Sequence, residues 1–427
     1  MHRFKTYVLS TLLQLILASS FISCEKWEYT GIKNIFIVYS IGYNNLNSHL
    51  TEDIKDITAN FKPSSPADIV MIYSHKAAKN ADYITPTSPT LTQLSLNRKG
   101  KVVTDTLVTY PATTNSASAE TLHEVLDFIN TRHPGSNCGI LFSSHSTGWA
   151  PEDYCNAPEE YDSTFEWAAR QIAGKRAEPT WGLQLPDGSP VVKSFGAQFY
   201  KQDGKTMMHE MDITDMAKAF PMKMDYIIFD SCFMGGVEVA YEFRNVCRYM
   251  IFSQTEILAD GMDYKTITSR VFSRTEQAMK QVCEDYYNQY INQTGSYRSA
   301  TISLVDCWRI EPLARICKDI FTDRHAEIAA SEGSTSIQRY FRHSSHKWFY
   351  DLESIVNHIG TPEDTLTRFR NALDGCVLYK AATERFMQEF DINEHSGLSM
   401  YLPYKDRTYL NNFYKNLEWN KATGLVQ

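Results

Sequence analysis

The sequence predicts an α/β fold in which a mostly parallel central sheet is covered by helices, with a helical elaboration toward the C-terminus. From residue 34 to about residue 253, short continuous apolar runs alternate with amphipathic helical segments. Continuous apolar runs are typical of strands buried on both faces, and their alternation with helices favours a parallel sheet between two helical layers. The 427 residues, 43% of them hydrophobic and 22% charged, have the composition of an ordinary globular protein with a large core.

The strongest apolar runs are the strands expected in this sheet. They cover residues 34–40, 68–74, 138–143, 226–230 and 249–253. Helical spacing of apolar residues predicts the intervening helices, over residues 46–61, 119–131, 211–220 and 235–243. Alternation over residues 102–110 predicts an edge strand or hairpin, whereas the polar residues 75–100 predict a loop.

The C-terminal part has mainly helical spacing. Helices are expected over residues 273–291 and 309–330, further helical segments over 335–388, and strands at 300–305 and 397–402. Residues 150–208 lack sustained periodicity and predict a long exposed insertion. No change in composition marks a linker, so residues 32–427 are expected to form one elaborated domain.

The N-terminus has the pattern of a secretion signal. Arg3 and Lys5 precede a mostly apolar run over residues 7–22, which is too short for a membrane span. Ser23-Cys24 resembles the processing site of bacterial lipoproteins, so residues 1–23 are expected to be a signal peptide and Cys24 a lipidated first residue, with a linker over 24–31. This predicts a lipid anchor in the bacterial cell envelope, at the outer membrane or cell surface; a plain signal peptide with a chance cysteine is the alternative.

Charge and missing motifs exclude several classes of protein. The net charge of −8 argues against a nucleic-acid partner held by a basic surface. The sequence has no GxSxG elbow, P-loop, HExxH or zinc-type Cys/His spacing, so no cofactor and no metal site is expected. Of the nine cysteines, all except Cys24 and Cys232 are expected to be small buried side chains, although one disulfide among them remains an alternative.

A cysteine and a histidine follow two of the predicted strands. Cys232 comes after strand 226–230 and before Gly235-Gly236 and a helix, and His145 follows strand 138–143. Because the carboxyl ends of parallel strands line one crevice, the two side chains are expected to meet, with the imidazole partly exposed. A helix N-terminus favours a thiolate, and an imidazole can exchange its proton, so the pair suits a cysteine hydrolase. A buried core cysteine and a solvated turn histidine are the plain alternatives.

A series of motifs resembles the clostripain family of cysteine peptidases. The motifs are His145-Ser-Thr-Gly-Trp149, Phe195-Gly196, Met211-Asp-Ile213, Asp230-Ser-Cys-Phe-Met-Gly-Gly-Val-Glu-Val-Ala-Tyr-Glu242, Ser253-Gln-Thr-Glu256 and Ser396-Gly-Leu-Ser-Met-Tyr-Leu-Pro403. The resemblance implies a caspase-like α/β/α sandwich and a dyad in which Cys232 is the nucleophile and His145 the general acid/base. It also implies cleavage of peptide or protein substrates after Arg or Lys, with calcium dependence known in some members.

The resemblance assigns further residues. The backbone N–H groups of Ser146 and Cys232 are expected to hold the oxyanion, and Asp230 to bind the basic side chain, with Asp260 as a second candidate. Asp230 has a plain alternative as a cap of the following helix. The family usually has Gly where Ser146 stands, and a positive φ there would strain a serine and impair catalysis.

Self-cleavage is also expected from the resemblance, at Lys175-Arg176 within the insertion, with Lys193, Lys201 and Lys205 as rival sites. A solvated charged loop is the alternative there. Two other functions stay open: a surface-anchored binding lipoprotein that has lost catalysis, for which Ser146 is the support, and an amidase or transpeptidase using the same dyad. A monomer is expected.

Overall fold

The computed structural model describes residues 29–44, 46–78, 85–151, 154, 198–202, 205–342 and 348–427. Within them the main sheet has nine strands in the order β12-β10-β9-β8-β5-β1-β2-β3-β4. Their bounds are β1 Asn34–Gly42, β2 Asp68–Lys76, β3 Thr90–Leu96, β4 Val102–Thr109, β5 Asn137–Ser143, β8 Met224–Asp230, β9 Cys247–Phe252, β10 Thr301–Asp306 and β12 Val377–Ala382.

The five central strands are parallel, and the outer strands are antiparallel to their neighbours. β9, β8, β5, β1 and β2 form the parallel part. β3 and β4 extend one edge and β10 and β12 the other. The predicted α/β fold with a mostly parallel sheet is therefore confirmed.

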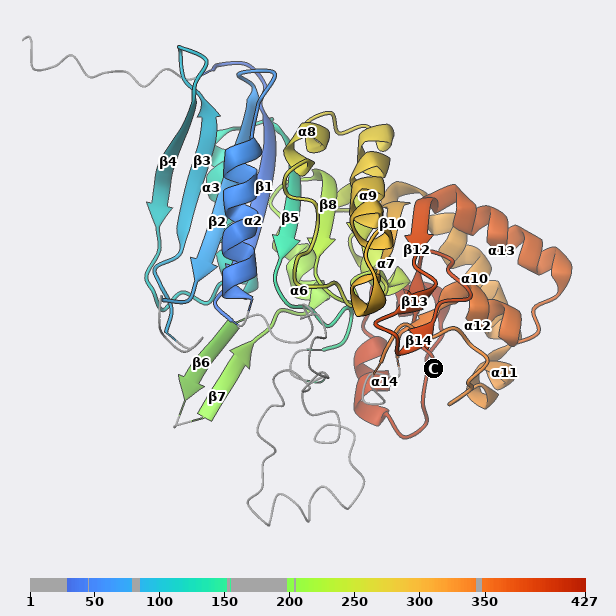
Figure 1. The fold of residues 1–427 in the computed structure, drawn as a ribbon. Helices are drawn as coiled ribbons and strands as arrows, with labels where there is room; N and C mark the ends of the chain where they lie inside the picture. The colour runs from blue at the N-terminus through green and yellow to red at the C-terminus, as the bar shows by residue number, and fades with distance from the viewer. Residues whose placement is uncertain are drawn as a thin grey trace, which may run out of the picture.

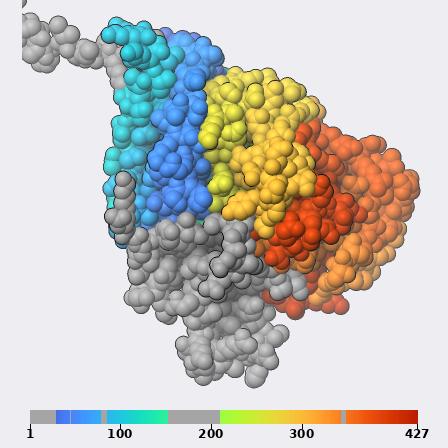
Figure 2. All heavy atoms as spheres, viewed as in Figure 1, coloured from blue at the N-terminus to red at the C-terminus, as the bar shows by residue number. Residues whose placement is uncertain are grey.

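Helices cover both faces of this sheet, as expected for an α/β/α sandwich. One layer contains α2 Asn47–Asn60, α8 Ile267–Val271 and α9 Glu276–Ile291, which lie on the near face in Figure 1. The other contains α3 Ala119–Arg132, α6 Ile213–Lys218, α7 Val237–Glu242, α10 Glu311–Asp323 and α15 Glu418–Thr423. The C-terminal elaboration adds α11 His325–Ala330, α12 Leu352–His358, α13 Glu363–Cys376 and α14 Thr408–Tyr414. It lies at the opposite end of the molecule from β3 and β4 (Figure 2).

Three local predictions were wrong. β3 lies within residues 75–100, which were expected to be a loop, and β12 lies within the expected helical stretch 335–388. The expected strand at 397–402 is only the short β15, Ser399–Met400, which pairs with β11, Tyr350–Asp351, outside the main sheet. The C-terminal end of the predicted insertion 150–208 forms a hairpin of β6, Gln198–Gln202, and β7, Lys205–His209.

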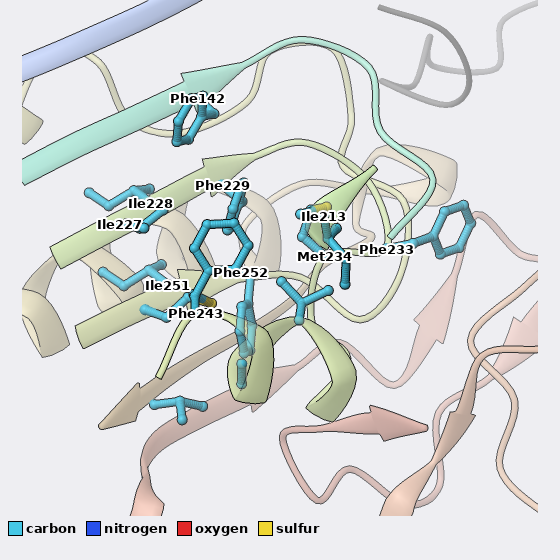
Figure 3. Close-up of a cluster of buried hydrophobic side chains, with 14 of the residues drawn as sticks. Phe142, Ile213, Ile227, Ile228, Phe229, Phe233, Met234, Phe243, Ile251 and Phe252 are labelled. Atoms are coloured by element: carbon cyan, nitrogen blue, oxygen red, sulfur yellow. The ribbon is translucent and has the colours of Figure 1, made fainter. Parts of the chain in front are cut away.

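Aromatic packing fixes β5 and β8 side by side. Phe142 of β5 stacks on Phe229 of β8 with ring centroids 5.5 Å apart, and Phe229 meets Phe243 edge-on at 5.9 Å (Figure 3). Gly139 of β5 is needed for this pairing, because a Cβ there would lie 2.0 Å from the ring of Tyr226. The two strands that precede His145 and Cys232 are thus held by a rigid apolar core.

A buried carboxyl group joins α7 to the C-terminal elaboration. Glu238 is fully buried, and its Oε1 accepts hydrogen bonds from the Tyr401 N–H at 2.8 Å and from the Tyr414 hydroxyl at 2.7 Å. Burial raises the pKa of Glu238 to about 7, although these hydrogen bonds oppose the shift. The carboxyl group therefore keeps its proton to a higher pH in the folded chain than in the unfolded chain.

Replacing this group, Glu238→Gln, is expected to change the pH dependence of stability. The folded chain binds the proton more tightly, so ionisation costs the wild type stability as pH rises from 4.5 toward 7. The cost is on the order of 3 kcal/mol at most, and the glutamine variant does not incur it. Urea unfolding across this pH range is expected to show the variant gaining on the wild type as pH rises. The exposed Glu120→Gln is the control, and parallel curves for wild type and Glu238→Gln would contradict the prediction.

Candidate active site

Cys232 and His145 leave the sheet at neighbouring positions. β5 and β8 are adjacent and parallel, and their register pairs Ser143 with Asp230, the last residue of each strand. Cys232 and His145 each lie two residues beyond this pair. The two loops that carry them therefore start side by side at the carboxyl edge of the sheet, where α/β folds place their binding crevices.

The two loops are also in direct contact. The hydroxyl of Ser146 donates a hydrogen bond to the carbonyl oxygen of Cys232, with an O–O distance of 2.5 Å. Gly148 has φ +65°, and a Cβ on it would lie 2.6 Å from the carbonyl oxygen of Phe233. A larger residue at position 148 would push the histidine loop away from the cysteine loop.

The sulfur of Cys232 lies in a well-defined backbone environment. It is fully buried, and its Sγ accepts a hydrogen bond from the Ile257 N–H at 3.1 Å. Phe233 has φ +60°, an uncommon conformation for a bulky residue, and its ring stacks on Phe349 at 4.5 Å. Figure 3 shows this ring projecting away from the apolar cluster around Phe229. Because α7 begins only at Val237, Cys232 does not lie in its first turn, and the expected placement on the helix tip was wrong.

His145 is more enclosed than expected. Its exposed fraction is only 6%, so the expectation of a partly exposed imidazole was wrong. It borders a small cavity of about 90 Å³, which Met211 and Ile213 also line. Ser146 is not among the described residues with positive φ, so the serine that replaces the usual glycine is not strained there.

The two candidate carboxylates for substrate binding have different surroundings. Asp230 is fully buried, and its Oδ2 accepts hydrogen bonds from the Ser143 hydroxyl at 3.0 Å and from the Tyr264 hydroxyl. Burial, and then the charge of Asp230, raises the pKa of Tyr264 well above its usual value, so the phenol stays a donor. Asp230 thus lies behind Tyr264 rather than at the surface.

Asp260 lies at the surface of a large cleft. Its side chain is 67% exposed, with its Oδ1 3.4 Å from Nδ1 of His49. Asp260 and Tyr264 line a cleft of about 710 Å³ together with Asp53 and Asp263. The segment 257–265 therefore runs from the sulfur of Cys232 to this cleft, with Asp230 behind the Tyr264 wall.

The remaining predicted residues are only partly described. Cys24, Lys175, Arg176 and Lys193 lie outside the described residues, while Lys201 and Lys205 belong to β6 and β7. The seven described cysteines are all buried and form no disulfide with one another. The described ranges hold no group of three or more His, Cys, Asp or Glu side chains that could bind a metal ion. Over the same ranges, no helix combines the length and apolarity that crossing a bilayer requires.

Several contacts at the site had no clear signal in the sequence. Tyr264 and Ser143 hold Asp230, and the Ile257 N–H contacts the sulfur. Arg342 forms a buried ion pair with Glu256, which the sequence marks only as a member of a motif. These partners come from segments far apart in the chain, and no periodicity or spacing relates them.

Comparison with known proteins agrees with this architecture. The model of the clostripain family matches residues 38–163 and 186–424. An inactive zymogen protease from Parabacteroides distasonis is 25% identical with a TM-score of 0.71, over 93% of this chain and 99% of that one. A secreted cysteine protease from Bacteroides thetaiotaomicron, solved with an irreversible peptide inhibitor, is 20% identical with a TM-score of 0.69, over 92% and 99%. The secreted cysteine protease "iotapain" of the same organism is 24% identical with a TM-score of 0.68, over 92% and 100%. A search of curated proteins found no match.

An α/β/α sandwich with a cysteine and a histidine on adjoining strand ends has the architecture of a cysteine peptidase. The family match covers most of the sequence, and this chain belongs to the clostripain family of cysteine peptidases.

Proposed function

We propose that this peptidase cleaves peptide bonds after arginine or lysine, with Cys232 as nucleophile and His145 as general acid and base. The observation that carries the proposal is the segment 257–265, because it links the thiol to an acidic cleft. Ile257 contacts the sulfur, and Asp260 and Tyr264 line the cleft. A carboxylate there can pair with a guanidinium or ammonium group of the substrate while the adjacent peptide bond faces the thiol.

The proposed reaction has two steps. The thiolate of Cys232 attacks the carbonyl carbon, and the backbone N–H groups of Ser146 and Cys232 bind the oxyanion. The C–N bond breaks as His145 gives a proton to the leaving amine, and a thioester remains. His145 then takes a proton from water, whose oxygen attacks the thioester and expels the thiolate.

We further propose that the intact chain is latent and matures by cleavage at Lys175-Arg176. Two observations support this: the sulfur of Cys232 is fully buried, and the 25% identical relative from Parabacteroides distasonis is an inactive zymogen. Cleavage between His145 and Cys232 would free the connecting segment and let the loops around the sulfur open to substrate.

Export and lipid anchoring through Cys24 are part of the same proposal. The secreted relatives from Bacteroides thetaiotaomicron support export. Cell fractionation checks the anchor. We expect the unaltered chain in the membrane fraction and the Cys24→Ser variant in the soluble fraction.

A panel of fluorogenic peptides that differ only at P1 tests the proposed function, with purified residues 25–427 as the enzyme. We expect kcat/KM for Arg and Lys peptides to exceed that for Gln, Met and Asp peptides by at least about 100-fold, as expected for a charge pair formed in the bound complex. Equal hydrolysis of peptides with neutral and basic P1 residues would show that the acidic cleft does not bind the P1 side chain. A lack of hydrolysis by the processed protein would favour the binding lipoprotein, although the ordinary φ of Ser146 gives that alternative no structural support.

A further inference from the structure

A buried ion pair lies next to the cysteine loop. The side chains of Arg342 and Glu256 are only 4% and 2% exposed. Arg342 donates from Nε to one carboxylate oxygen of Glu256 at 2.5 Å and from Nη2 to the other at 2.8 Å. This is the bidentate geometry that fixes a carboxylate most firmly, and its two hydrogen bonds offset part of the cost of removing both charges from water.

The residues around Glu256 hold the cysteine loop through backbone hydrogen bonds. The Ile257 N–H donates to Cys232 Sγ at 3.1 Å, and the Phe233 N–H donates to the Thr255 carbonyl oxygen at 3.0 Å. Glu256 lies between these two contact points in the chain. A fixed Glu256 side chain therefore fixes the N–H group that faces the sulfur.

Arg342 also brings a charge near the sulfur, because it pairs with Glu256, and the N–H of the next residue, Ile257, contacts Cys232 Sγ. Burial would lower the pKa of Arg342, but Glu256 reverses this, and the charges of Glu389 and of an ionised Cys232 add to the net rise. The guanidinium stays protonated and interacts favourably with a thiolate at position 232. Among the described residues, the titratable groups near Cys232 include His145, Asp230, Glu256 and Tyr286; burial raises the pKa of Tyr286, so its phenol stays neutral.

We propose that Arg342 is a positioning residue of this peptidase: paired with Glu256, it holds the Ile257 N–H against Cys232 and favours the thiolate form of that cysteine. This inference rests on the proposed role of Cys232 as nucleophile. The two members of the pair act on the thiolate with opposite signs, because the guanidinium attracts its charge and the carboxylate repels it.

Alkylation of Cys232 by iodoacetamide, followed over pH by mass spectrometry of the Cys232 peptide, tests the proposal on protein from residue 25 in which each variant has first been processed with a trace of active wild type. In Arg342→Gln we expect the pH midpoint of alkylation to rise by about one unit, which is a tenfold slower reaction below the midpoint. In Glu256→Gln we expect the midpoint to fall, because the arginine charge is no longer offset. Arg342→Lys is expected to keep the midpoint near that of the wild type, because the positive charge remains. It is expected to lower kcat, because lysine cannot make the two parallel hydrogen bonds that hold Glu256.

Arg370→Gln is the matched control. Arg370 of α13 also donates from Nε to a glutamate, Glu353 of α12, at 2.7 Å. It is expected to leave the midpoint and kcat unchanged. Shifts of the same sign in Arg342→Gln and Glu256→Gln, or no shift in either, would overturn the proposal and leave the pair as a structural contact. If Arg342→Gln does not fold, the fall in Glu256→Gln and the unchanged midpoint of Arg342→Lys still decide it.

The failure of this inference can be told from the failure of the proposed function. Peptide hydrolysis that survives Cys232→Ala removes Cys232 as the nucleophile. Hydrolysis that depends on Cys232, combined with an unmoved midpoint in both variants of the pair, removes only the role of Arg342.

Discussion

Replacing Cys232 by alanine is expected to abolish peptide hydrolysis and to leave the chain in one piece. No other described group takes the position of its sulfur, which faces the Ile257 N–H beside the histidine loop. Removal of a covalent nucleophile leaves only the residual effect of binding and of oxyanion stabilisation, so kcat is expected to fall by about 10⁴-fold or more. The fold should persist, because the change deletes one small sulfur atom.

A denaturing gel and a covalent probe give two independent measurements of this prediction. If the chain processes itself after Arg176, a sample of residues 25–427 should resolve into fragments 25–176 and 177–427. Cys232→Ala should remain whole and should not be labelled by a peptidyl-Arg or peptidyl-Lys electrophile. Addition of a trace of active wild type should then cleave the variant, which would show that its processing site is intact.

Cys376→Ala is the matched control, because Cys376 is also a buried cysteine but lies at the end of α13. It is expected to process, to label and to hydrolyse peptides as the wild type does. Equal behaviour of the Cys232 and Cys376 variants in all three measurements would rule out Cys232 as the nucleophile. If Cys232→Ala is cleaved into the same fragments when no enzyme is added, a contaminating protease is responsible, and self-processing is refuted.

The central strands could be predicted from the sequence because each is a continuous apolar run. β1, β2, β5, β8 and β9 are buried on both faces, and few other local structures contain such runs. β3 was missed because Thr90–Leu96 is rich in Thr, Ser and Gln and pairs only at the antiparallel edge of the sheet. β12 was missed because Val377 follows helix α13 with no turn residue between them.

The position of Cys232 and His145 at one edge could likewise be predicted, because parallel strands bring their carboxyl ends together. Their burial could not. The Ile257 N–H faces the sulfur, Arg342 pairs with the neighbouring Glu256, and the ring of Phe233 stacks on that of Phe349. These contacts join segments far apart in sequence, and each depends on the completed packing rather than on a local pattern.

The same limit applies to the two carboxylates. Asp230 was expected to contact the substrate because the family resemblance gives this role to the aspartate of the cysteine motif, a relation in sequence alone. Its burial behind Tyr264 depends on the chain folding back after β9. We therefore propose that Asp260 contacts the basic side chain directly, while Asp230 holds the Tyr264 wall of the cleft and adds its charge from behind.

Asp260→Asn is expected to remove most of the preference for basic P1 residues. A substrate cation that enters the cleft would bury the pair with Asp260, and loss of one partner of such a pair typically costs about 2–5 kcal/mol. Since each 1.4 kcal/mol is about tenfold, kcat/KM for Arg and Lys peptides should fall by about 30-fold or more. Peptides with neutral P1 residues should be little affected, because asparagine keeps the size of the side chain.

Asp263→Asn is the control for this prediction, because Asp263 lines the same cleft but accepts hydrogen bonds from Thr266 and from the Lys265 N–H within its own segment. It is expected to keep the preference for basic residues. Asp230→Asn is expected to behave differently from both: it should lower stability, because a buried acceptor of Ser143 and Tyr264 is altered, as well as lowering kcat/KM for basic peptides. Unchanged selectivity in Asp260→Asn together with a selective loss in Asp230→Asn would return the direct contact to Asp230, and would require Tyr264 to move aside when the substrate binds.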